Sequence, residues 1–216
     1  MKKALRVNIR ARITALSDDD LSRQSAAVCE RLVRAECYRS SRKVGLFLSM
    51  PRGELQTEPI LRHAFSQGKR VFCPRVVGPG CMEMSEVHSY DEARALPRSR
   101  WGIPEPPAAA PAVDPAELDL IVVPAVSLDL GRRRCGHGGG FYDRYIARAR
   151  GSGQDCGGQG REGRPCRAIG VGLIEQREDA VPVDEHDEIL DAVIFPDMEA
   201  WAEDAALPAD APPDAR

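Results

Sequence analysis

Apolar residues in the first part of the chain recur at the spacing of a helix. Within residues 18–36, Leu21, Val28 and Leu32 fall on one face, and Ser17 stands before three aspartates in the manner of a helix cap. Residues 2–15 also fit a helix. The pattern therefore predicts two helices, over residues 2–15 and 18–36, before any strand.

After residue 43 the pattern changes to short apolar runs. Residues 44–48 form a continuous run, which is typical of a strand buried on both faces. A helix is predicted from Thr57 to Gly68, and a second strand follows at 70–74. The same criteria predict strands at 82–87, 118–124, 168–174 and 192–195, and a helix at 141–150. A strand–helix–strand order favours a parallel sheet, so we expect the α/β class: a single three-layer αβα domain with an open, mainly parallel sheet.

Three segments have the composition of loops. Residues 104–115 are rich in proline and alanine, residues 151–165 in glycine, and the chain after residue 196 in alanine, proline and acids. One domain is expected over residues 1–196, with a glycine-rich insert at 151–165 and a disordered acidic tail at 197–216.

Charge changes this picture more than overall composition does. The formal net charge of the 216 residues is −3, but residues 1–43 carry a net charge of +6 and residues 197–216 carry −5. A basic first segment indicates either an anionic ligand or a solvated helix face. Nucleic acid is not expected as a partner, because the chain is mildly acidic and has no basic stripe interleaved with aromatic residues. No apolar run approaches the roughly 20 residues of a membrane span, so no membrane association is expected.

The cysteines and the start of the chain bear on its compartment. The seven cysteines are widely spaced and include no C-x-x-C pair, so neither a disulfide framework nor a zinc site is expected. The basic start lacks the apolar region of a secretory signal. We expect a cytoplasmic location, with import into an organelle as the alternative.

The most informative segment follows the predicted strand at 118–124. Residues 132–144 begin with three arginines, continue with four glycines in five positions and end in the predicted helix. Glycines expose backbone N–H groups and a helix N-terminus adds its positive end, which is typical of a phosphate site. Neither a P-loop nor a dinucleotide fingerprint is present, and a plain flexible turn is the alternative. The arginines favour phosphate, as does Asp143, whose carboxylate suits magnesium.

Two further carboxylates are candidates for binding. Glu54 lies beyond the carboxyl end of the strand at 44–48, where open α/β sheets bind ligands, and it suits a ring rich in N–H donors. Asp187 lies in the acidic segment 182–187. The alternative for Glu54 is a solvated loop glutamate. The alternative for Asp187 is a helix cap or a plain surface charge.

Together these motifs resemble the 5-formyltetrahydrofolate cyclo-ligases, also called 5,10-methenyltetrahydrofolate synthetases. The resemblance runs from Lys2 to about Phe195. It rests on motifs in a fixed order, at residues 2–6, 47–50, 54–57, 101–106, 119–124, 134–144, 175–176 and 181–191. Each motif alone is weak, but their order and spacing together are specific.

The resemblance implies an ATP- and magnesium-dependent conversion of 5-formyltetrahydrofolate to 5,10-methenyltetrahydrofolate, with release of ADP and phosphate. The formyl oxygen would be phosphorylated and N10 would then attack, because an N-formyl group is a poor electrophile with a poor leaving group. Catalysis would be mainly positioning and charge neutralisation. The substrate is expected with one or several glutamates, and the protein is expected to be a monomer.

The resemblance also assigns residues to these roles. Arg134, His137 and Tyr142 would be catalytic, and Asp143 and Asp187 would hold Mg²⁺. Folate would contact Leu48, Glu54, Trp101 and Tyr142. ATP would be bound by Lys2, Lys3, Ala4, Leu5 and Arg6 and by Arg134, Cys135, Gly136, His137, Gly138, Gly139, Gly140, Phe141 and Tyr142.

His137 and Gly139 depart from the family pattern, since many members have a basic or aromatic residue at the first position and some have lysine at the second. Less fixed positive charge is therefore expected over the phosphates, and a neutral histidine can only form hydrogen bonds. Two other functions remain open from the sequence: a folate- or nucleotide-binding protein without turnover, and another phosphate-handling enzyme such as a sugar-phosphate isomerase. Glu54 and Trp101, taken with the glycine loop, favour folate and ATP.

Overall fold

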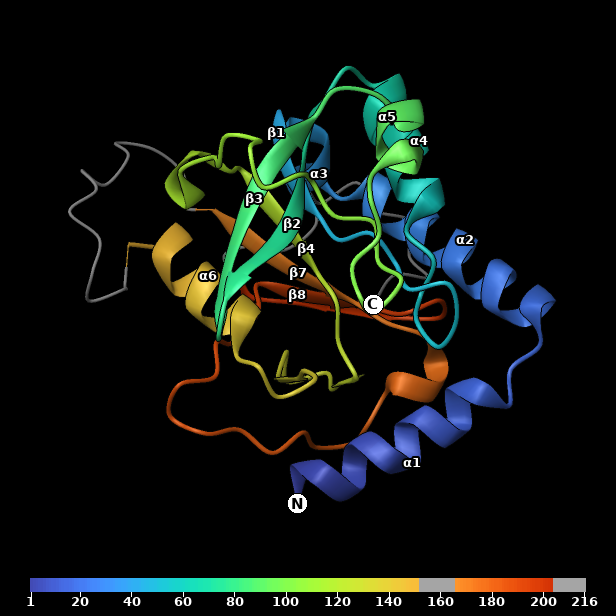
Figure 1. Cartoon of the computed structure of the whole chain (residues 1–216). Helices are drawn as coiled ribbons and strands as arrows, with labels where there is room; N and C mark the ends of the chain where they lie inside the picture. Colours follow the sequence, from blue (N-terminus) through green and yellow to red (C-terminus); the bar gives the residue numbers. More distant parts are fainter. Residues whose placement is uncertain (152–165, 204–216) are drawn as a thin grey trace.

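The computed structural model of the chain describes residues 1–151 and 166–203 (Figure 1). The glycine-rich insert expected at 151–165 lies outside the described residues except for Gly151, and so does the tail from residue 204 onward.

A seven-stranded sheet forms the centre of the molecule. Its strand order is β3-β2-β1-β4-β7-β8-β9, and all neighbours from β2 to β8 are parallel, whereas β3 and β9 pair antiparallel at the two edges. The bounds are β1 Lys43–Leu46, β2 Arg70–Gly78, β3 Cys81–Val87, β4 Leu120–Val123, β7 Arg167–Val171, β8 Ala192–Ile194 and β9 Glu199–Trp201. A separate antiparallel pair joins β5 Ser127–Leu128 to β6 Arg134–Cys135.

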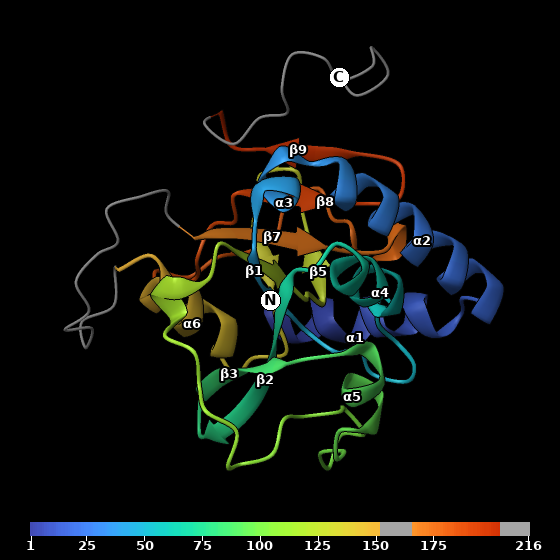
Figure 2. The same cartoon turned by 90° about the horizontal axis from the view of Figure 1, so that it is seen from above.

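Helices cover both faces of the sheet and one of its ends. Their bounds are α1 Lys2–Thr14, α2 Asp18–Arg34, α3 Glu36–Ser40, α4 Glu58–Ser66, α5 Tyr90–Ala95 and α6 Phe141–Ala149, with 3₁₀ turns at Pro115–Glu117 and Ile174–Gln176. Figures 1 and 2 show α2 and α4 on one side of the sheet and α6 on the other, while α1 crosses beyond the sheet end. This three-layer arrangement confirms the predicted α/β class.

Local sequence explains where these helices begin and end. The Ser17 side chain accepts a hydrogen bond from the Asp20 backbone N–H at 3.0 Å, which caps α2. Gly68 follows α4 with φ of +65°, a left-handed conformation that glycine adopts without strain. The Lys69 N–H then donates to the Ala64 carbonyl at 3.0 Å and closes the helix.

The core consists of two apolar clusters, one on each face of the sheet. Val28 of α2 and Ile60 of α4 pack with alternate residues of β1 and β4 in one cluster. Ile146 of α6 packs with Ile121 and Val123 of β4 in the other. Because β4 is fully buried on both faces, it has the continuous apolar sequence that the prediction used.

The structure corrects several boundaries. The predicted second helix ends at Arg34, and residues 36–40 form the separate α3, because Ala35 takes an extended conformation between them. Disorder was expected from residue 197 onward, and this prediction is wrong for residues 199–201. They form β9, which pairs with β8 from Ala192↔Trp201 to Ile194↔Glu199. Sequence analysis also missed α5 and the β5–β6 pair. These elements are too short to show a periodic sequence pattern. Pairing or packing with the rest of the fold stabilises them.

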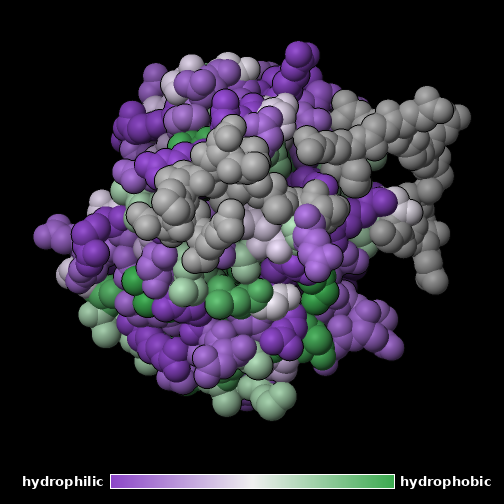
Figure 3. All heavy atoms as spheres, turned by 180° about the vertical axis from the view of Figure 1, so that it is seen from behind, coloured by the Kyte–Doolittle hydropathy of each residue, from purple (hydrophilic) through white to green (hydrophobic). Residues whose placement is uncertain are grey.

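The surface is that of a charged protein. Seen from behind, it is mostly hydrophilic with apolar groups interspersed near its middle (Figure 3). Among the described residues, no helix is long and apolar enough to cross a membrane.

Candidate active site

Parallel strands direct their carboxyl ends to one edge of the sheet, and the predicted site residues follow these ends. The loop of residues 47–57 leaves β1, and residues 124–140 leave β4. Because β1 and β4 are adjacent, the segment carrying Glu54 and the glycine loop that contains residues 136–140 start side by side. The fold therefore brings together the two halves of the site that the sequence predicted separately.

The glycine loop ends in the N-terminus of α6. Gly138 has φ of +101° and Gly140 has φ of +63°, so two of its residues adopt conformations that L side chains rarely tolerate. Gly140 is the N-cap of α6, and no side chain caps the helix. Within the described residues no side chain competes for the first N–H groups of α6, so these groups could bind an anion.

Arg134 lies at the base of this loop and is almost fully buried. Its Nη2 donates to Asp143 Oδ1 at 2.7 Å, and its guanidinium lies 5.9 Å from the centre of the Tyr142 ring. Its Nε is buried and has no hydrogen-bond partner among the described residues. A buried donor without a partner costs free energy, so this atom is suited to a ligand acceptor.

The N-terminal helix α1 is held against the glycine loop and the acidic segment. Arg6 Nε donates to the Gly136 carbonyl at 2.7 Å. Lys2 Nζ forms ion pairs with Asp184, at 2.7 Å, and with Asp187. Hence Arg6 lies beside the glycine loop and Lys2 lies beside the acidic segment, although both partners are far away along the chain.

The two predicted metal ligands lie close to this cationic cluster. Asp143 accepts hydrogen bonds from Arg134 and, at 3.3 Å, from the Glu188 backbone N–H, so it adjoins the acidic segment. Burial acts to raise the pKa of Asp187, but the bonds from Lys2 and from the Asp184 N–H outweigh it and lower that pKa. Asp187 is therefore ionised at neutral pH, the form that binds a cation. No cluster of three or more metal-ligating side chains occurs in the described part of the chain.

Glu54 lies in the loop that follows β1, on the other side of the site. Its side chain is buried and accepts a hydrogen bond from the Met50 N–H at 2.9 Å. Burial raises the pKa of Glu54 to about 7. The Gln56 amide donates to the carbonyls of Met50, at 3.2 Å, and Glu54, at 2.8 Å, and so fixes this loop. Gln56 is a positioning residue that our sequence analysis did not single out.

Three apolar or aromatic residues were also assigned to folate. Leu48 is buried in the core just beyond β1. Trp101 is 62% exposed, and the Arg100 guanidinium lies 4.4 Å from its ring centre. A Cβ on the neighbouring Gly102 would lie 3.8 Å from Pro51, so the Trp101 turn adjoins the Glu54 loop. Tyr142 packs against both core clusters.

His137 lies on the solvent side of the glycine loop. Surrounding protein partly desolvates its ring, and the charges of Arg10, Arg6 and Arg134 also oppose its protonation, so its pKa is lowered. The ring is therefore neutral at pH 7, a form that can form hydrogen bonds but carries no charge.

The remaining predicted residues differ in what they contribute. Lys3 and Ala4 are exposed, whereas Leu5 packs against the core. Cys135 is buried in β6, and Phe141 packs on the second core cluster. Gly139 is crowded by Phe141, whose ring would lie 2.4 Å from an added Cβ. Cys135, Phe141 and Leu5 therefore have structural roles in the described contacts.

An open α/β sheet with a glycine loop, a buried arginine and carboxylates at its carboxyl edge defines a class of anion-binding α/β proteins. Comparison with known proteins specifies the family within this class. The family model described as the 5-formyltetrahydrofolate cyclo-ligase family matches residues 1–196. This chain therefore belongs to the 5-formyltetrahydrofolate cyclo-ligase family of enzymes.

Relatives agree with the family model across nearly their full length. The chain is 32% identical to "Probable 5-formyltetrahydrofolate cyclo-ligase" of Schizosaccharomyces pombe, over 91% of this chain and 95% of the relative. It is 32% identical to the cyclo-ligase of Mus musculus, over 92% of this chain and 95% of the relative. The solved 5,10-methenyltetrahydrofolate synthetase of Aquifex aeolicus superposes with a TM-score of 0.74 at 26% identity, covering 95% of this chain and 94% of that structure.

Proposed function

We propose that this protein converts 5-formyltetrahydrofolate to 5,10-methenyltetrahydrofolate with consumption of ATP in the presence of Mg²⁺, releasing ADP and phosphate. Family membership supports the folate conversion. The roles of ATP, magnesium and individual residues are the part that we add from the geometry of the site. The proposal includes a monomer in the cytoplasm that takes the substrate with one or several glutamates.

One observation carries the proposal: Tyr142 joins the two halves of the site. Its ring lies 5.9 Å from the Arg134 guanidinium, on the side of the glycine loop. Burial raises the pKa of Tyr142, and the nearby charge of Glu54 raises it further. The same aromatic ring thus adjoins a cationic half suited to polyphosphate and a buried carboxylate suited to a pterin.

The cationic half has the groups that a triphosphate requires. Lys2, Arg6 and Arg134 supply charge, residues 136–140 supply backbone N–H groups, and the unpartnered Arg134 Nε supplies a buried donor. In the ligand-free chain, Lys2 is neutralised by Asp184 and Asp187. On nucleotide binding we expect Lys2 to exchange these carboxylates for phosphate oxygens.

The carboxylates fit magnesium when phosphates complete its coordination. Mg²⁺ in nucleotide sites commonly binds one or two protein carboxylates together with waters and phosphate oxygens. Asp143 and Asp187 both contact the cationic cluster, so two carboxylates suffice without a third protein ligand. When bound, the ion would neutralise charge on the phosphates.

Glu54 would hold the pterin. Its buried carboxylate can accept hydrogen bonds from the N–H groups of the ring, and the Met50 N–H keeps it oriented. Its raised pKa means that the free protein holds Glu54 partly protonated at neutral pH. Donors from the ring would favour the ionised form, so binding of folate and loss of the proton are coupled.

The chemistry then requires few protein groups. Phosphorylation of the formyl oxygen makes the formyl carbon electrophilic and creates a phosphate leaving group. N10 of the same folate attacks that carbon and loses its proton, and phosphate leaves with the former formyl oxygen and takes up a proton, so that the ring closes as the methenyl product. The protein contributes by orienting the two substrates and by placing Arg134 at the developing charge.

The direct test measures methenyltetrahydrofolate by absorbance, with purified protein and 5-formyltetrahydrofolate. ATP and Mg²⁺ are each omitted in turn. We expect product only in the complete mixture. Product formed without ATP would refute the phosphorylation step, and binding of both substrates without product would identify a non-catalytic binding protein.

A further inference from the structure

A hollow along α1 is bordered by Lys3 and Arg6, which were assigned to the nucleotide, and by Arg10, which has no assigned role. The hollow has a volume of about 720 Å³ and is lined by seven residues, six of α1 and Ala15 directly after it. None of the seven is acidic. Like charges held close together repel each other, so such a surface favours a bound anion.

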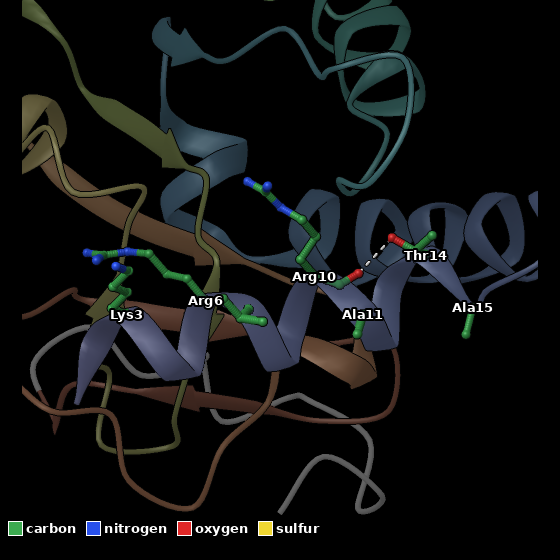
Figure 4. Close-up of a pocket in the computed structure, with 7 residues that line it drawn as sticks. Lys3, Arg6, Arg10, Ala11, Thr14 and Ala15 are labelled. Atoms are coloured by element: carbon green, nitrogen blue, oxygen red, sulfur yellow. Dashed lines mark hydrogen bonds between the residues drawn. The ribbon is translucent and has the colours of Figure 1, made fainter.

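Arg10 differs from the other arginines at this end of the sheet. Arg6 is held by the Gly136 carbonyl, and Arg12 pairs with Glu178 at 2.8 Å. The Arg10 guanidinium has no hydrogen bond or ion pair with any residue that the structure describes; the Thr14 hydroxyl donates to the backbone carbonyl of Arg10, not to its side chain. In Figure 4 its side chain extends from α1 toward the strands of the sheet, on the side opposite to Ala11 and Ala15.

The position of Arg10 along α1 relates it to both halves of the site. The start of α1 contacts the acidic segment through Lys2, and α1 also contacts the 3₁₀ turn Ile174–Gln176, just beyond which Glu178 pairs with Arg12 near the end of the helix. That turn is bonded to Gln24 of α2, and the adjacent Ser25 accepts a hydrogen bond from the Gln56 N–H at 3.0 Å. Along α1, Arg10 therefore lies further than Arg6 from the proposed magnesium ligands and nearer to the loop that carries Glu54.

The charge of Arg10 also reaches the glycine loop, because it opposes protonation of His137 together with Arg6 and Arg134. Arg6 and Arg10 are one helical turn apart, roughly 6 Å along the axis. Each guanidinium can donate two parallel hydrogen bonds to phosphate oxygens, so two of them one turn apart can bind a polyphosphate at two places.

We propose that Arg10 binds the terminal phosphate of the nucleotide, one turn beyond Arg6 and on the folate side of the cationic cluster. The inference rests on the proposed use of ATP. The terminal phosphoryl group must approach the formyl oxygen, so a cation on the folate side contacts this group rather than the inner phosphates. An arginine there neutralises charge on the oxygens of the group in transfer.

The test compares ATP with ADP, which lacks the terminal phosphate. Calorimetric titrations with Mg²⁺ present are made on the wild-type chain, Arg10→Ala, Arg10→Lys and Arg12→Ala. The last variant removes the same charge from the same helix outside the site. Loss of a charged hydrogen bond predicts that Arg10→Ala binds ATP roughly 10- to 100-fold more weakly, with ADP affinity unchanged. Arg10→Lys should recover part of the ATP affinity, and Arg12→Ala should bind both nucleotides as the wild type does.

Other outcomes overturn the assignment. Equal losses for ATP and ADP would move Arg10 to the inner phosphates, and an effect on folate binding alone would assign it to the folate carboxylates. Unchanged affinities in a wild-type protein that forms product would overturn the role of Arg10 and leave the proposed function intact. A wild-type chain that binds neither nucleotide would overturn both.

Discussion

Arg6 donates a hydrogen bond from Nε to the carbonyl oxygen of Gly136 at 2.7 Å, across 130 residues of chain. Through this contact the first helix and the glycine loop form one surface. The basic charge of α1 is thereby concentrated on the loop rather than spread into solvent, and the conformation of the loop determines where Arg6 lies.

Gly138→Ala should weaken ATP binding through Arg6. At φ of +101° an alanine is strained, and its Cβ would lie 3.4 Å from Arg6 Nη2. Gly68→Ala is the matched control, because Gly68 also has positive φ but has no atom within 4 Å of the added Cβ and caps the remote α4. Both variants should lose about 1–2 kcal/mol of stability. Calorimetry should show lower ATP affinity for Gly138→Ala only. The same ATP affinity in both variants would show that Gly138 has no role in nucleotide binding.

Arg134→Ala should raise the ATP concentration needed for half-maximal rate and should also destabilise the fold. The ion pair of Arg134 with Asp143 is buried, with side chains 5% and 13% exposed. Removing one partner of such a pair costs roughly 3–5 kcal/mol because it leaves the other charge unpaired.

Asp143→Ala in the same chain should restore part of the stability lost in Arg134→Ala without restoring the ATP response. Urea denaturation and steady-state kinetics measure the two effects separately. An unchanged ATP response in Arg134→Ala would remove this arginine from the phosphate site.

Glu54→Gln should reduce folate binding more than ATP binding. The amide can still accept a hydrogen bond from the Met50 N–H, so the loop is retained, but a neutral acceptor binds ring N–H donors more weakly than a carboxylate. Separate calorimetric titrations with 5-formyltetrahydrofolate and with ATP make the comparison. Equal losses for the two ligands would contradict the assigned pterin pocket.

The same substitution should stabilise the protein at alkaline pH. Burial raises the pKa of Glu54 from 4.5 to about 7, so the folded state holds the proton more tightly than the unfolded chain does. Stability is lost as pH rises from the unfolded pKa toward 7, and the penalty reaches about 3 kcal/mol above it. Glu54→Gln should therefore be more stable than the wild type at pH 8, with the difference vanishing near pH 4. A pH-independent difference would show that ionisation of Glu54 is not its cause.

Asp187→Asn should raise the magnesium requirement, whereas Asp184→Asn should change it little. Both carboxylates contact Lys2, but the Asp187 side chain is 19% exposed and the Asp184 side chain 75%. Rates measured over a range of Mg²⁺ concentrations at saturating ATP distinguish the two variants. Similar curves for both would assign these aspartates to holding Lys2 and not to the metal.

The predicted elements with long apolar patterns were confirmed, and short ones were missed. The continuous apolar residues of β4 and the capped start of α2 gave local signals that no tertiary contact contradicts. Strand β9 is short and only partly buried, and it forms because its backbone pairs with the edge of β8. Arg10 was missed for a similar reason: its spacing from Arg6 was visible, but a free guanidinium cannot be distinguished from a paired one without partners.

The sequence by itself determined the α/β class, the glycine loop with its arginines, and the family, because these depend on local periodicity and on residue types at fixed spacing. Only the tertiary structure decided which charges meet. Lys2 reaches Asp187, Arg134 pairs with Asp143, and the Arg10 guanidinium has no partner within residues 1–151 and 166–203. These relations depend on distances between segments far apart in the chain and on burial, which sets the pKa of Glu54 near 7 in a protein whose sequence shows only a loop glutamate.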